Sequence, residues 1–89
     1  MSNHLETDSL QTLIKAVENY REELEVNKKI LVNAADVCDA AMGSDDIAKK
    51  HIAKLNEALG ELDKTSKLAE EVAKALKEDL RMAQSVMDD

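Results

Sequence analysis

Apolar residues recur at alternating spacings of three and four along nearly the whole chain, and this rhythm constrains the fold more than any other feature. In the first half, the pattern comprises Leu10, Leu13, Val17, Tyr20, Leu24, Asn27, Leu31, Ala34, Cys38 and Ala41, and only Asn27 breaks its apolar character. In the second half, it comprises Ala48, Ile52, Leu55, Leu59, Leu62, Ser66, Ala69, Ala73, Leu76, Leu80, Ala83 and Met87. Such spacing aligns side chains on one face of an α-helix at the period of coiled coils. Each half is therefore predicted to form one long helix.

The segment between the two stripes carries the residues that end one helix and begin another. Gly43 can adopt the left-handed conformation that terminates a helix, and Ser44 can cap the next helix. Asp45 and Asp46 follow in the first turn, where the positive end of the helix dipole favours carboxylates. We therefore predict a tight turn at this point.

The expected element boundaries follow from these signals. Helix one is expected to begin near Thr7–Ser9, whose side chains can cap free backbone amides. We predict a single domain over residues 1–89, with helix one at about 8–42, a turn at 43–44 and helix two at about 45–87. Because only about two residues separate the helices, they must fold back on each other as an antiparallel hairpin.

Composition supports an all-α fold with a thin core. Pro, Phe and Trp are absent, Gly occurs only at 43 and 60, and Tyr20 is the single aromatic residue. Several apolar residues lie outside the two stripes, namely Ile14, Val26, Ile30, Val32, Ala35, Val37, Ala40, Met42, Ile47, Ala58, Leu68, Val72 and Ala75. Two helices alone bury little surface, so we expect a second copy or a helical partner to complete the hairpin to a bundle. The alternative interpretation is a set of scattered exposed aliphatic residues.

A partner is expected to dock on the apolar helix faces. The predicted partner-binding residues are Leu24, Ile30, Leu31, Val37, Leu55, Leu59, Leu62 and Val72. Facing residues of the hairpin should have numbers that sum to about 87, which sets Leu31 near Leu55. Asn27 then falls near Gly60. It is either a polar residue in contact with water at the edge of the helix–helix interface or a group that fixes the register of the two helices. Gly60 requires either close backbone approach or simple solvent exposure.

Charge and chemistry argue against other functional classes. The net charge is −7, with 12 Lys and Arg against 19 Asp and Glu, so a nucleic-acid partner is disfavoured. The most apolar run is too short and too interrupted to span a membrane, and no signal peptide precedes the helices, so we expect synthesis in the cytoplasm. His4 and His51 lack the neighbours that metal sites need, and Cys38 is expected in the core. We expect no enzyme activity, cofactor, metal or small-molecule substrate.

The layout resembles the WXG superfamily, the ESAT-like helical hairpins that serve as substrates and targeting partners of type VII secretion. The resemblance covers nearly the whole chain and rests on its length, its two amphipathic helices and the mid-chain turn at Gly43 and Ser44. Ala41 stands where the Trp of the family's Trp-x-Gly turn would be, and the tail after helix two lacks the family's aromatic export signal. The resemblance implies a member that pairs with a signal-bearing hairpin, or that binds the helical N-terminal domain of an LXG-type toxin. It also implies export without a cleavable signal peptide as one fate of the chain.

Two other functions remain open. One is a structural or regulatory homodimeric coiled-coil protein, such as a phage protein or an antitoxin-like inhibitor that neutralises a basic surface. The other is a type III needle-type hairpin, although the Pro-containing turn of those proteins is replaced here by Gly43 and Ser44.

Overall fold

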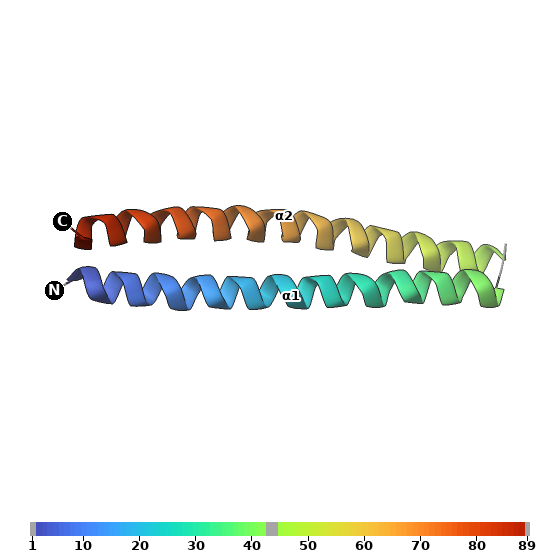
Figure 1. Cartoon of the computed structure of the whole chain (residues 1–89). Coiled ribbons are helices and arrows are strands. Elements are labelled where there is room, and N and C mark those ends of the chain that lie inside the picture. Colours follow the sequence, from blue (N-terminus) through green and yellow to red (C-terminus); the bar gives the residue numbers. More distant parts are fainter. Residues whose placement is uncertain (1, 43–44, 89) are drawn as a thin grey trace. The chain divides into compact units, whose positions relative to one another are not determined.

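The protein is an all-α helical hairpin, as the sequence predicts. The computed structural model describes residues 2–42 and 45–88, with the side chains of 6–41 and 45–86. Helix α1 spans Ser2–Met42 and helix α2 spans Asp46–Asp88, and no strand occurs within these described ranges (Figure 1). Both helices are rich in Ala, Leu, Glu and Lys and contain no Pro, which favours uninterrupted helix. The predicted turn residues Gly43 and Ser44 lie outside the described residues.

Helix α1 begins earlier than the sequence predicts. Its first residue is Ser2, whereas the capping side chains near Thr7 suggested a start at about residue 8. Thr7 lies inside the helix with only 7% of its surface exposed, so it contributes to packing and does not cap the helix. The preceding residues include neither Gly nor Pro, and the helix therefore continues through them.

Asp45 caps the N-terminus of α2. The backbone N–H of Ile47 donates a hydrogen bond to Asp45 Oδ1 at 3.0 Å, and the N–H of Lys49 donates to the Asp45 carbonyl oxygen at 3.0 Å. This is the geometry of an N-cap residue. The sequence prediction assigned the cap to Ser44, which lies outside the described residues, and the contacts of Asp45 give Asp45 this role. Asp46 follows in the first turn, where a carboxylate interacts favourably with the helix dipole.

The chain divides into two compact units, each built from one segment of α1 and one segment of α2. Unit 1 comprises Met1–Glu22 and Lys67–Asp89, and unit 2 comprises Glu23–Ser66. In unit 2, Cys38 Sγ lies 3.8 Å from the Ala48 carbonyl oxygen, so the thiol donates a weak hydrogen bond across the helix pair. This contact agrees with the predicted register within one residue.

The seam of unit 1 is the line along which its two helix segments pack. On α2, Ala69 and Ala73 are buried, with 8% and 1% of their surfaces exposed. The remaining inward-facing residues of this unit are Thr7, Leu10, Ile14, Val17, Glu18, Arg21, Glu70, Leu76, Leu80 and Ala83, of which Thr7 is buried and the others are half-buried. The α2 residues of the predicted stripe therefore face inward, and the side chain of Met87 lies outside the described residues.

The seam of unit 2 is closed by Leu24, Cys38 and Ala48, which are 4%, 8% and 0% exposed. The burial of Cys38 confirms its predicted place in the core. The half-buried residues of this unit are Lys28, Leu31, Ala34, Ala35, Ile52, Leu55, Ala58, Leu59, Leu62, Thr65 and Ser66. Here too, every α2 residue of the predicted stripe faces inward.

The predicted stripe on α1 is only half correct. Leu10, Val17, Leu24, Leu31 and Cys38 face inward as expected, and these residues recur once per heptad. The other five stripe residues, which lie three positions after these, were also predicted to face inward. Four of them are exposed, namely Leu13, Tyr20, Asn27 and Ala41, and the fifth, Ala34, is half-buried. The residues that face inward instead are Thr7, Ile14, Arg21, Lys28 and Ala35. The seam thus follows the other edge of the apolar sector of α1.

Gly60 and Asn27 are both exposed, which resolves the alternatives left open by the sequence. A Cβ atom built on Gly60 would have no neighbour within 4 Å, so solvent exposure accounts for this glycine and close backbone approach does not. The exposure of Asn27 fits a wetted position and does not fit a buried group that fixes the register.

Replacing Asp45 by Ala should destabilise the protein by about 1 kcal/mol, because the amide of Ile47 loses its capping acceptor. Asp45→Asn should retain nearly full stability, since an asparagine side chain caps helices equally well. Urea unfolding followed by circular dichroism measures both variants. Equal losses in the two variants would show that the side-chain cap is not what stabilises this end of α2.

Gly60→Ala should raise the free energy of unfolding by up to about 1 kcal/mol, because glycine is a poor helix former and the added methyl group meets no atom. Ala53 is a matched control, since it lies one heptad earlier on α2 and is also exposed. Ala53→Gly should lower stability by a similar amount. A destabilised Gly60→Ala variant would contradict the open environment of this residue.

Candidate protein-binding surface

One flank of the unit 1 seam is held by ion pairs. Lys77 Nζ on α2 lies 3.1 Å from Glu18 Oε1 on α1, and Arg21 Nη1 lies 3.3 Å from the same oxygen. The hydrogen bond from Lys77 is the main reason that the pKa of Glu18 lies below its ordinary value, and the charge of Arg21 lowers this pKa further. We call these three residues the ion-paired flank of unit 1.

Unit 2 has an equivalent flank. Lys28 Nζ on α1 lies 2.8 Å from Asp63 Oδ1 on α2 and 3.2 Å from Glu25 Oε1. The hydrogen bond to Asp63, followed by that to Glu25, raises the pKa of the Lys28 ammonium above its ordinary value. Lys28, Asp63 and Glu25 form the ion-paired flank of unit 2. In both units, charged side chains therefore join α1 to α2 along one flank of the seam.

The opposite flank of unit 1 is apolar and uncovered. Its large exposed residues are Leu13, Tyr20, Leu68, Val72, Met82 and Val86, each with 47% to 61% of its surface exposed. Leu13 and Asp79 line the same hollow, which places their helix faces on one side of the seam. Tyr20 follows Leu13 by one heptad, and Val72 and Val86 lie one heptad on either side of Asp79. We call these six residues the apolar flank of unit 1.

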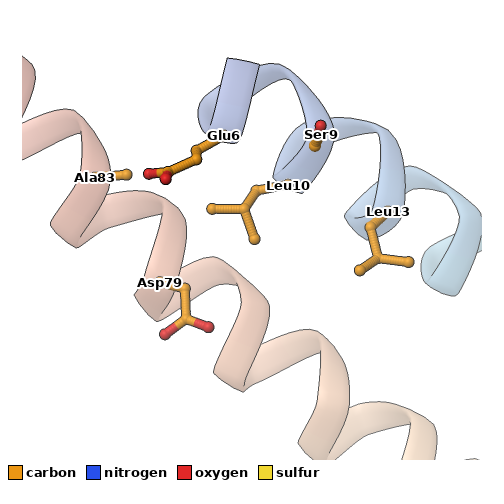
Figure 2. Close-up of a pocket in the computed structure, with 6 residues that line it drawn as sticks. All are labelled: Glu6, Ser9, Leu10, Leu13, Asp79 and Ala83. Carbon is orange, nitrogen blue, oxygen red and sulfur yellow. The ribbon is translucent and has the colours of Figure 1, made fainter. Parts of the chain in front are cut away.

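The hollow on this flank has a volume of about 410 Å³ and opens to solvent. Figure 2 shows Leu10 between Glu6 of α1 and Asp79 of α2, with Leu13 farther along α1 and Ala83 beside the Glu6 carboxylate. Ser9 completes the lining. Neither Glu6 nor Asp79 forms an ion pair with another residue in the part of the chain that the structure describes. The hollow thus combines an apolar floor with two carboxylates.

In unit 2, a shorter apolar surface follows α1. Ile30 and Val37 are 57% and 66% exposed and lie one heptad apart, with half-buried Ala34 between them. We call these three residues the apolar flank of unit 2. Val32, which is 46% exposed, lies one heptad after Glu25 and therefore belongs to the ion-paired side of α1.

The predicted partner-binding residues fall into two groups. Ile30, Val37 and Val72 are exposed and available for contact. Leu31, Leu55, Leu59 and Leu62 are half-buried in the seam, and Leu24 is buried at 4% exposure within unit 2. In this structure, the seam leucines stabilise the hairpin itself, and Leu24 is not accessible to a partner.

The prediction did not assign several exposed residues to the surface. Leu13 and Tyr20 were placed in the seam, because the stripe that contains them is the most regular one in α1. Leu68 and Val72 were predicted to lie outside the stripe, but no prediction named Met82 or Val86. These four residues repeat at spacings of three and four when Ala75 and Asp79 are included, and this second rhythm is the signal that marks their face. Glu6 and Asp79 carry no sequence signal of their own.

Other kinds of site have little support in the described ranges. Residues 2–42 and 45–88 contain no group of three or more His, Cys, Asp or Glu side chains arranged to hold a metal ion. His51 is exposed near the start of α2. Neither helix, over its described residues, is apolar enough for long enough to cross a membrane.

The ion pairs predict a stability maximum between acid and alkaline pH. Because the pKa of Glu18 is lowered from 4.5, its contribution is present above that value and is lost as pH falls through the folded-state pKa. Because the pKa of Lys28 is raised from 10.5, its contribution is present below that value and is lost as pH rises through the folded-state pKa. The urea midpoint should therefore decrease on both sides of this window.

In Glu18→Gln, the urea midpoint should fall less steeply as the pH is lowered, because the titrating carboxylate of the pair with Lys77 is gone. Urea unfolding measured between about pH 3 and pH 7 tests this. The matched control is Glu22→Gln, because Glu22 is exposed and forms no ion pair with the described residues. This control should retain the wild-type acid slope. An unchanged slope in Glu18→Gln would contradict a stabilising role for the pair with Lys77.

Comparison with known proteins adds no relative. The sequence matches no family model, and neither the curated proteins nor the solved structures include a significant match.

Proposed function

We propose that the chain is a non-enzymatic protein-binding subunit that docks on a helical partner through the apolar flanks of units 1 and 2. The observation that carries the proposal is the asymmetry of the two flanks in unit 1. One flank joins the helices through Glu18 and Lys77, whereas the other exposes six large apolar side chains. Contiguous exposed apolar surface on a small protein commonly marks an interaction site.

The thin seam provides a second reason. Among the described side chains, the buried apolar residues are Leu24, Cys38, Ala48, Ala69 and Ala73, and only the leucine is large. Small helical chains with so little buried surface usually need additional burial for stability. A helix that covers the apolar flank would supply that burial.

The resemblance to the WXG superfamily specifies the proposal further. The chain would then be a targeting partner or co-secreted substrate of a type VII secretion system, pairing with a helical toxin domain or another small hairpin. Synthesis would occur in the cytoplasm, with export through that system as one fate. The support for this specific role is the two-helix layout alone.

Light scattering of the purified protein, alone and after co-expression with the proteins encoded beside it, tests the proposal. A monomer that forms a stable mixed complex with a neighbour is the expected result. A tight homodimer that ignores every neighbour would instead support a structural or regulatory coiled-coil protein.

Substitutions on the apolar flank of unit 1 and on the apolar flank of unit 2 should separate binding from folding. Val37→Asp and Val72→Asp should each weaken the mixed complex by roughly tenfold or more, because a carboxylate would be buried at the interface. Both residues are exposed, so the unfolding midpoint should change little. Val32→Asp is the control, since Val32 is similarly exposed but lies on the ion-paired side. Equal loss of binding in all three variants would argue against a defined docking face.

A further inference from the structure

The hollow in unit 1 gives chemical information about the partner. Its apolar surface is formed by Leu10, Leu13 and Ala83, and its carboxylates belong to Glu6 and Asp79 (Figure 2). The two carboxylates come from different helices and line the same hollow. At about 410 Å³, the hollow has ample room for one long side chain.

We infer that the hollow accepts a lysine or arginine side chain presented by an amphipathic helix of a partner protein. The aliphatic stem of either residue packs against leucine and alanine, while the cationic head remains near the water and the carboxylates. This matches the hollow, where Leu10 lies between Glu6 and Asp79. The inference rests on the proposed function, because it identifies the kind of helix that the apolar flank of unit 1 binds.

Charge complementarity favours this occupant over a second copy of the chain. The chain has a net charge of −7, and a second copy would bring its own Glu6 and Asp79 to the same kind of surface. Like charges placed together at an interface oppose association. Glu6 and Asp79 also lack ion pairs within the described residues, unlike Glu18 on the ion-paired flank of unit 1 and Asp63 on the ion-paired flank of unit 2. A basic group from outside the chain would pair with carboxylates that have no ion pair with the described side chains, which are those of residues 6–41 and 45–86.

The surrounding surface suits a helix and not an isolated cation. Leu13 and Tyr20 continue along α1, and Val72 and Val86 continue along α2 from the faces that line the hollow. A partner helix can therefore place its apolar residues on this flank while one basic side chain enters the hollow. Helices that dock in this way present residues at spacings of three and four.

A pair of synthetic helical peptides provides the test. Both carry the same leucine stripe, one has lysines at the edge of the stripe, and the other has glutamates at the same positions. Binding to the full chain is measured by fluorescence anisotropy, and methyl NMR signals of Leu10, Leu13 and Ala83 report contact at the hollow. The lysine peptide should bind and shift these signals, and the glutamate peptide should bind roughly tenfold more weakly or worse.

The variant Glu6→Gln with Asp79→Asn should weaken binding of the lysine peptide by roughly tenfold. Its matched control is Glu22→Gln with Glu71→Gln, which removes the same charge from exposed residues of unit 1 that do not line the hollow. The control should bind within about twofold of the wild-type protein. Circular dichroism should show the same unfolding midpoint for the wild type and the hollow variant, because neither hollow carboxylate pairs with a described residue.

Several results would overturn the inference. Equal affinity for the two peptides, equal losses in the hollow and control variants, or unshifted methyl signals would each exclude a basic side chain in the hollow. A homodimer that buries the same methyl groups would identify a second copy as the occupant. If any of these occurred while co-expression still gave a mixed complex sensitive to Val72→Asp, the proposed function would stand and only this inference would fail. Absence of any mixed complex would count against the proposed function itself.

Discussion

The packing of small side chains along the seam is the constraint on which the other features depend. Ala48 and Ala73, one in each unit, are 0% and 1% exposed. The distance between packed helices depends on the side chains at their contact, and alanine permits close approach. A seam of this kind has little room for bulky groups at its centre, so most leucines and isoleucines pack at its edges and remain half-buried. The thin core and the exposed apolar flank both follow from this arrangement.

The same constraint accounts for the charged residues in the seam of α1. Arg21 and Lys28 occupy positions where a regular coiled coil would place apolar residues, yet both are half-buried. Their aliphatic stems can cover the edge of a narrow seam while the charged ends reach the surface. There, Arg21 contacts Glu18, and Lys28 contacts Asp63 and Glu25. The ion-paired flank therefore combines apolar coverage with links that cross between the helices.

The sequence predicts α2 better than α1, and the reason lies in the width of the apolar sector. On α2, the most regular stripe is bordered on one edge by charged residues such as Lys49, Asp63 and Lys77, and this stripe is the one that faces inward. On α1, residues on either edge of the central inward-facing row could complete the seam. That row consists of Leu10, Val17, Leu24, Leu31 and Cys38. The periodicity of the sequence identified this row. It did not show which neighbouring row of α1 packs against α2 beside it, because that choice depends on contacts with α2 such as the ion pair of Lys28 with Asp63. The hollow was likewise beyond prediction, since it requires knowing that Glu6 and Asp79 border the same space.

The separation of the two flanks has a consequence for how binding and folding are linked. Charge pairs such as Glu18 with Lys77 join the helices on the side away from the apolar flank, so a partner can cover Leu13 or Val72 without displacing these contacts. A partner that binds only the folded hairpin stabilises it by mass action, by about 2.7 kcal/mol at a hundredfold excess over Kd. For a hairpin with so small a core, that gain is a substantial fraction of the stability typical of small domains. Under the proposed function, the apolar flank of unit 1 would therefore serve both to recognise a partner and to let that partner raise the fraction of the chain that is folded.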